Sequence, residues 1–107
     1  MTTFNDREAG FENKFKHDKE LQFKVMNRRN KLLGLWAANL LGIHGVEAEN
    51  YAKTVVMSDF NKPGDQDVLV KVLADFQAKG VDMSEHRLRK FMDELMHTAN
   101  EQIHNEA

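Results

Sequence analysis

Three of the five histidines share one face of a predicted C-terminal helix and suggest a metal-binding site. At 100° per residue, His86, His97 and His104 lie within about 20° of one another. Along the helix axis, however, they are separated by about 16 and 10 Å, whereas a zinc–nitrogen bond is only about 2 Å long. A single ion therefore cannot bind two of them. We predict a row of solvated histidines and no metal site.

The remaining reactive residue types form no catalytic pattern. Ser58 and Ser84 lack the glycine-flanked setting of a hydrolase nucleophile, and Ser84 suits the N-cap of a helix. No glycine is followed by the Lys-Ser/Thr pair of a phosphate-binding loop. The chain has no cysteine, which excludes a disulfide framework and a cysteine-based zinc or redox site. We predict a protein that is not an enzyme and that uses no cofactor.

A basic cluster without intervening acidic residues contains Lys24, Arg28, Arg29 and Lys31. The net charge of the whole chain is −2, which argues against a nucleic-acid binder that neutralises phosphates. A basic run is typical of a solvated helix face. Arg29 instead falls within the apolar stripe of its predicted helix, where burial would be costly without a partner. We interpret this helix end as protruding from the domain, with Arg29 in solvent.

Four segments have the apolar periodicity of helices, near residues 19–43, 46–61, 66–79 and 84–104. Gly42, Pro63-Gly64 and Gly80 separate them. The candidate N-caps are Asp18, Asp65 or Asp67, and Ser84. Short loops between four helices predict an all-α fold, a four-helix bundle of antiparallel neighbours.

The common core of this bundle is predicted to contain seven apolar side chains from the four helices, which are Trp36, Tyr51, Phe60, Leu73, Phe76, Phe91 and Leu95. Gly34 is expected on the opposite side of the first helix. Residues 68–73 could also form a buried strand, but no convincing partner strand exists in the chain. The longest apolar stretch, residues 32–43, is too short to cross a bilayer. The N-terminus lacks the apolar run of a signal peptide, and we expect a cytoplasmic protein.

Residues 1–18 differ from the rest because they lack a continuous apolar stripe and contain Gly10. Phe4, Phe11 and Phe15 nevertheless fall within about 40° of one another, in phase with the core face of the first helix. Aromatic residues on a marginal helix predict a flexible segment that becomes ordered on a partner surface. The alternative is that these phenylalanines fold back onto the bundle. We therefore divide the chain into a partner-binding arm, residues 1–18, and a four-helix bundle, residues 19–107.

The string Arg-Arg-Asn-Lys-Leu-Leu-Gly-Leu-Trp-Ala-Ala at residues 28–38 resembles the ζ-subunit family of inhibitors of the α-proteobacterial F-type ATP synthase. The strings at residues 4–8 and 11–15 support the resemblance, which continues through most of the chain. It implies a bundle preceded by an inhibitory segment from Met1 to about Lys19. It further implies binding to the catalytic head, formed by α, β and γ subunits, where that segment enters a catalytic interface as a helix. The protein would lie at the inner membrane only through the synthase, with no membrane insertion of its own.

The predicted partner-binding residues combine the aromatic row with nearby cations, and they are Phe4, Arg7, Phe11, Lys14, Phe15, Lys24, Arg28 and Arg29. Two other functions remain open at this stage. One is a helical adaptor for a different protein, with the phenylalanines as its docking motif. The other is a small-ligand binder that senses a nucleotide, with Lys24, Arg28 and Arg29 as weak phosphate contacts.

Overall fold

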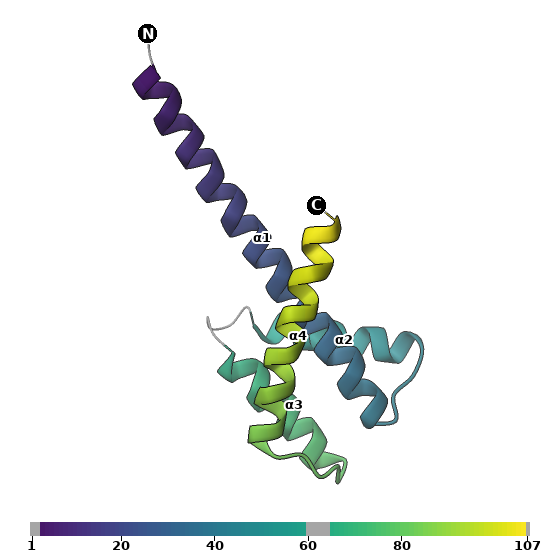
Figure 1. Ribbon diagram of the computed structural model, residues 1–107. Coiled ribbons are helices and arrows are strands. Elements are labelled where there is room, and N and C mark those ends of the chain that lie inside the picture. Colours follow the sequence, from purple (N-terminus) through teal and green to yellow (C-terminus); the bar gives the residue numbers. More distant parts are fainter. Residues whose placement is uncertain (1–2, 60–64, 107) are drawn as a thin grey trace.

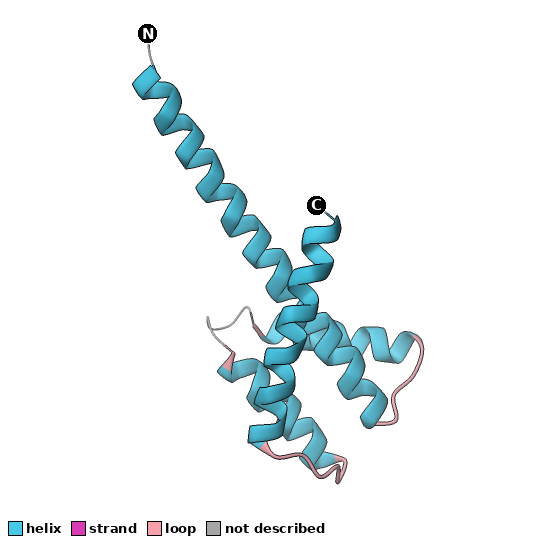
Figure 2. Ribbon diagram, viewed as in Figure 1, coloured by secondary structure: helices cyan, strands magenta, loops and turns pink. Residues whose placement is uncertain are grey.

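The computed structural model consists of four helices joined by short loops, α1 (Thr3–Leu40), α2 (Val46–Ser58), α3 (Gln66–Ala78) and α4 (Glu85–Glu106) (Figure 1). The structure describes the backbone of residues 3–59 and 65–106, and the side chains of residues 19–59 and 65–106. Every regular element within these ranges is a helix, including residues 68–73 (Figure 2). The all-α four-helix prediction is therefore confirmed.

Helix α1 is longer than the periodicity predicted. It begins at Thr3 rather than near residue 19, so residue 18 lies inside the helix and the predicted Asp18 cap is wrong. The 38 residues correspond to a rod about 57 Å long at 1.5 Å per residue. This helix accounts for most of the longest dimension of the molecule, 66 Å.

The helix ends follow local signals in the sequence. After α1, the Ile43 N–H donates to the Ala38 carbonyl at 2.8 Å and the Gly42 N–H to the Asn39 carbonyl at 3.2 Å. This Schellman pair requires the left-handed φ of +78° that Gly42 adopts. The same pair of bonds closes α3 around Gly80. At the start of α4, the Ser84 hydroxyl accepts the Arg87 N–H at 3.1 Å, which confirms the predicted N-cap.

The main core lies where α1, α2, α3 and α4 meet, and Phe76 is fully buried in it. Trp36 packs face to face on Phe91, with ring centroids 4.1 Å apart, and edge-on to Phe76. Five predicted core residues are only partly buried against this core, namely Trp36, Tyr51, Leu73, Phe91 and Leu95. Predicted core residue Phe60 lies outside the described residues.

The sequence analysis places Gly34 on the side of α1 away from the core, and this prediction is wrong. A Cβ atom at this position would lie 2.5 Å from the Ala52 Cα atom and 3.3 Å from Val55 Cγ2. Gly34 therefore faces α2 rather than solvent, because α1 is covered on two sides. The missing side chain is what lets the two helix backbones approach this closely.

Helices α2 and α3 are joined by a polar contact. The Tyr51 hydroxyl donates to Asp75 Oδ2 at 2.7 Å, and Lys71 Nζ lies 2.9 Å from the same oxygen. Burial raises the pKa of Tyr51, and the hydrogen bond to the Asp75 carboxylate and its negative charge raise it further. The tyrosine therefore remains a protonated donor well above neutral pH.

Candidate partner-binding arm and its attachment

The arm, residues 1–18, contains five of the predicted partner-binding residues. From Thr3 onward its backbone continues α1 without a break, and this half of the helix projects past the C-terminal end of α4 (Figure 1). Phe4, Arg7, Phe11, Lys14 and Phe15 thus lie on the projecting half, and their side chains lie outside the described residues. A single helical phase now links the arm to the bundle.

The arm is attached through the arm root, which we define as residues 19–31. A second apolar cluster, separate from the main core, joins the root to the last turns of α4. Its buried members are Val25, Ala99 and Ile103, and Leu21, Leu32 and Met96 pack around them. This cluster stabilises α1 against α4 directly below the point where the arm leaves the bundle.

Arg28 reinforces the same junction. Its Nη1 donates to Gln102 Oε1 and its Nη2 to Glu106 Oε1, both at 2.9 Å. The Arg28 side chain is 28% exposed and that of Glu106 is 56% exposed, so water screens the ion pair. Arg28, predicted to bind a partner, is thus already engaged by α4 in the free chain. Gln102 and Glu106, spaced by four residues on one face of α4, are positioning residues that the sequence analysis missed.

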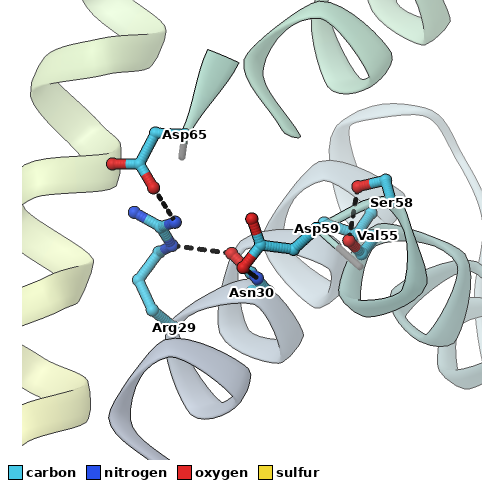
Figure 3. Close-up of polar contacts among 6 residues, drawn as sticks. All are labelled: Arg29, Asn30, Val55, Ser58, Asp59 and Asp65. Atoms are coloured by element: carbon cyan, nitrogen blue, oxygen red, sulfur yellow. Dashed lines mark hydrogen bonds and ion pairs between the residues drawn. The ribbon is translucent and has the colours of Figure 1, made fainter. Parts of the chain in front are cut away.

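Arg29 is where the structure overturns the sequence interpretation. Its side chain has no exposed surface, so it is not a solvated residue on a protruding helix end. Arg29 Nη2 donates to Asp65 Oδ1 at 2.7 Å, and Nε donates to Asn30 Oδ1 at 2.8 Å (Figure 3). Asn30 in turn donates to Asp59 Oδ2 at 3.2 Å.

The Arg29 network explains how a charge can lie in the apolar stripe of α1. The guanidinium reaches the carboxylate of Asp65, the residue just before α3, and this pairing offsets the cost of its burial. Asp65 occupies the N-cap position of α3, but its side chain makes no capping hydrogen bond because it binds Arg29. In this structure Arg29 is accessible neither to a partner nor to a phosphate.

The basic side chains of the arm root gather beside the second cluster, whose Leu21 and Ile103 they adjoin. Lys24, Arg28 and Lys31 line a hollow of about 520 Å³ between α1, α2 and α4. Its other lining residues are Leu21, Asn27, Val56, Ile103 and Glu106. A row of cations above an apolar floor is suited to acidic side chains of a partner.

Metal-binding clusters and membrane-spanning helices are absent from the described residues. His86, His97 and His104 are exposed, as predicted. Within residues 19–59 and 65–106, the structure places no three histidine or acidic side chains where they could hold an ion together. None of the described helices combines the length and apolar character needed to cross a membrane.

Comparison with known proteins agrees with this architecture. A family model described as ATPase inhibitor subunit zeta matches residues 1–102. A protein whose structure was solved in solution by NMR is 44% identical and superposes with a TM-score of 0.72. That match covers 81% of this chain and 99% of the solved chain. The comparison with curated proteins finds no match. The extent of the family match over the arm and the bundle shows that the chain belongs to the ATPase inhibitor subunit zeta family.

Proposed function

We propose that this chain inhibits ATP hydrolysis by the F-type ATP synthase, and that its arm enters a catalytic subunit interface of the head as a helix. The observation that carries the proposal is the projection of α1 beyond the bundle as one continuous helix (Figure 1). Membership of the inhibitor family supports the inhibitory function. The helical continuity supports the arm as the element that performs it. The bundle then serves as a holder without catalytic chemistry.

The anchored root favours helix formation in the arm. Starting a new helix costs about 4 kcal/mol, the equivalent of a nucleation constant of about 10⁻³. An arm that extends α1 avoids this cost, because the root is already helical and packed on α4. The ordering of the added residues still opposes binding, at about 1–2 kcal/mol each.

Burial of the aromatic row in the partner contributes free energy that offsets part of the cost of ordering the arm. Burial of Phe4, Phe11 and Phe15 in an apolar groove contributes about 1.5–3 kcal/mol each. Backbone hydrogen bonds and dispersion contacts of the ordered helix contribute the rest. Arg7 and Lys14 are suited to acidic or carbonyl groups at the edges of the groove, as in other helix-in-groove interfaces.

Outside the arm, we propose that Lys24 and Arg28 contact the head from the root, where their charge steers association. Arg29 is excluded from this set, because it is buried and paired with Asp65. The interface therefore follows α1 from the arm onto the first turns that the bundle holds.

Deletion of residues 1–18 tests the proposal. The shortened chain should lose inhibition of hydrolysis by the isolated catalytic head and keep the melting temperature of the bundle. Phe11→Ala should weaken inhibition by about tenfold or more, the equivalent of about 1.4 kcal/mol. Asn13→Ala, on the opposite face of the same helix turn, is the matched control and should inhibit normally. If the shortened chain inhibits as well as the full chain, the arm is a passive extension and the proposal fails.

A further inference from the structure

A second groove lies beside the arm root, between α1 and α4, and we call it the α1–α4 groove. It has a volume of about 480 Å³. Four residues of α1 line it, Leu21, Gln22, Val25 and Met26, and three of α4, Met96, Asn100 and His104. Val25 is buried in the second apolar cluster, whereas both methionines are half-buried and reachable from outside.

The chemistry of this groove differs from that of the basic hollow. Among the described residues that line it, none is Lys, Arg, Asp or Glu, although such residues make up 30% of the chain. The basic hollow, in contrast, contains three cations and Glu106. Methionine side chains are flexible and polarisable, and they adapt to apolar groups of varied shape. Four of its seven described lining residues are apolar, Leu21, Val25, Met26 and Met96, and this part of the α1–α4 groove fits an uncharged, apolar element.

The groove also continues the aromatic row of the arm. Gln22 and Met26 follow Phe15 by seven and eleven residues, which places both within about 20° of it at 100° per residue. By helical phase alone, positions 4, 11, 15, 22 and 26 fall within about 60° on one face of α1. Met26 lies only about 16 Å beyond Phe15 along the helix axis.

We infer that the surface of the catalytic head that receives the arm extends into the α1–α4 groove and packs apolar side chains against Met26 and Met96. The inference rests on the proposed function, because it takes the arm as the inhibitory element. A partner that covers the phenylalanine stripe would also reach Gln22 and Met26, which form part of the α1 wall of the groove. Where the arm ends, the last turns of α4 lie beside α1 (Figure 1), and there the partner would meet Met96, Asn100 and His104 of the groove. The bundle then contributes a specific contact as well as a support for the arm.

A charge placed in the groove tests the inference with the full-length chain. Met96→Glu should raise the concentration needed for half-maximal inhibition by about tenfold or more, since an unpaired carboxylate would be buried against apolar groups. Met57→Glu is the matched control, because Met57 is an exposed methionine on α2 outside this groove. The control should inhibit as the unmodified chain does. Unchanged inhibition by Met96→Glu would overturn the inference.

A cross-linking experiment decides the matter even if Met96→Glu lowers stability. The chain has no cysteine, so Asn100→Cys at the rim introduces a single thiol for a photoreactive label. Cross-links to the head subunit that also cross-links to the arm would support the inference. Cross-links only to a second copy of the chain or to its own arm, or none, would overturn it.

The two proposals fail differently in these experiments. If deletion of residues 1–18 leaves inhibition intact, the proposed function fails. Inhibition could instead depend on the arm but be unchanged by Met96→Glu, with no cross-link from position 100 to a head subunit. In that case the proposed function stands and only the inference about the α1–α4 groove fails.

Discussion

Removal of the Asp65 carboxylate should destabilise the bundle strongly, although Asp65 lies at a loop end. Arg29 is fully buried and its Nη2 lies 2.7 Å from Asp65 Oδ1. Removal of one partner from a buried ion pair costs about 3–5 kcal/mol, because the other charge remains buried without compensation. The Asp65 side chain is 38% exposed, so water can partly replace it. We therefore expect Asp65→Ala to lower the free energy of unfolding by about 2–3 kcal/mol.

A double-mutant cycle measures this interaction by urea denaturation. Arg29→Met keeps the apolar stem of the side chain and removes the buried charge, so it should cost less than Asp65→Ala. Once Arg29 has been replaced, Asp65→Ala should have little further effect, which gives a coupling free energy of about 1.5 kcal/mol or more. A single Asp65→Ala variant within about 0.5 kcal/mol of the unmodified protein would refute this reasoning. Inhibition by the folded fraction should not change in any of these variants.

Three further predictions concern packing, protonation and charge. Gly34→Ala should lower the free energy of unfolding by about 1–3 kcal/mol in thermal denaturation, because the added Cβ would collide with the Ala52 backbone. An unchanged free energy of unfolding would contradict the close packing of α1 on α2. The single tyrosine, Tyr51, should ionise above its ordinary pKa of about 10 in a spectrophotometric titration. Because folding raises the pKa of Tyr51, the contribution of its hydroxyl to stability is complete below about pH 10 and declines as the pH rises further. Ionisation at the ordinary pKa would show that the hydroxyl is solvated. Lys24→Gln together with Arg28→Gln should slow association with the catalytic head at low salt and reduce its salt dependence, and an unchanged on-rate would remove this row from the interface.

The features that sequence reasoning predicted correctly have local causes. Gly42 and Gly80 end their helices through contacts with residues three to five positions earlier, and Ser84 caps α4 through the residue three positions later. The apolar residues of the segment 66–79 have helical spacing, and the lack of a partner strand in the chain favours a helix over a strand there. Sequence signals that act over three to five residues can be recognised without knowledge of how the helices pack.

The errors arose where the outcome depends on distant partners. Arg29 is buried because Asp65, 36 residues later, reaches it, and periodicity carries no information about that pairing. Gly34 faces α2 because a second helix covers α1 on that side. The sequence predicts the start of α1 too late, because residues 1–18 are weak helix formers when judged alone. Continuity with a packed root removes the nucleation cost that this judgement included.

Hydrogen exchange of the arm amides in the inhibited complex tests the central claim most directly. The account predicts that amides of residues 3–18 exchange much more slowly in the complex with the catalytic head than in the free chain, because the bound arm is a buried helix. The Asn13→Ala chain should show the same protection, and the Phe11→Ala chain should show less at equal concentration. Full inhibition with unchanged exchange throughout residues 3–18 would contradict insertion of the arm.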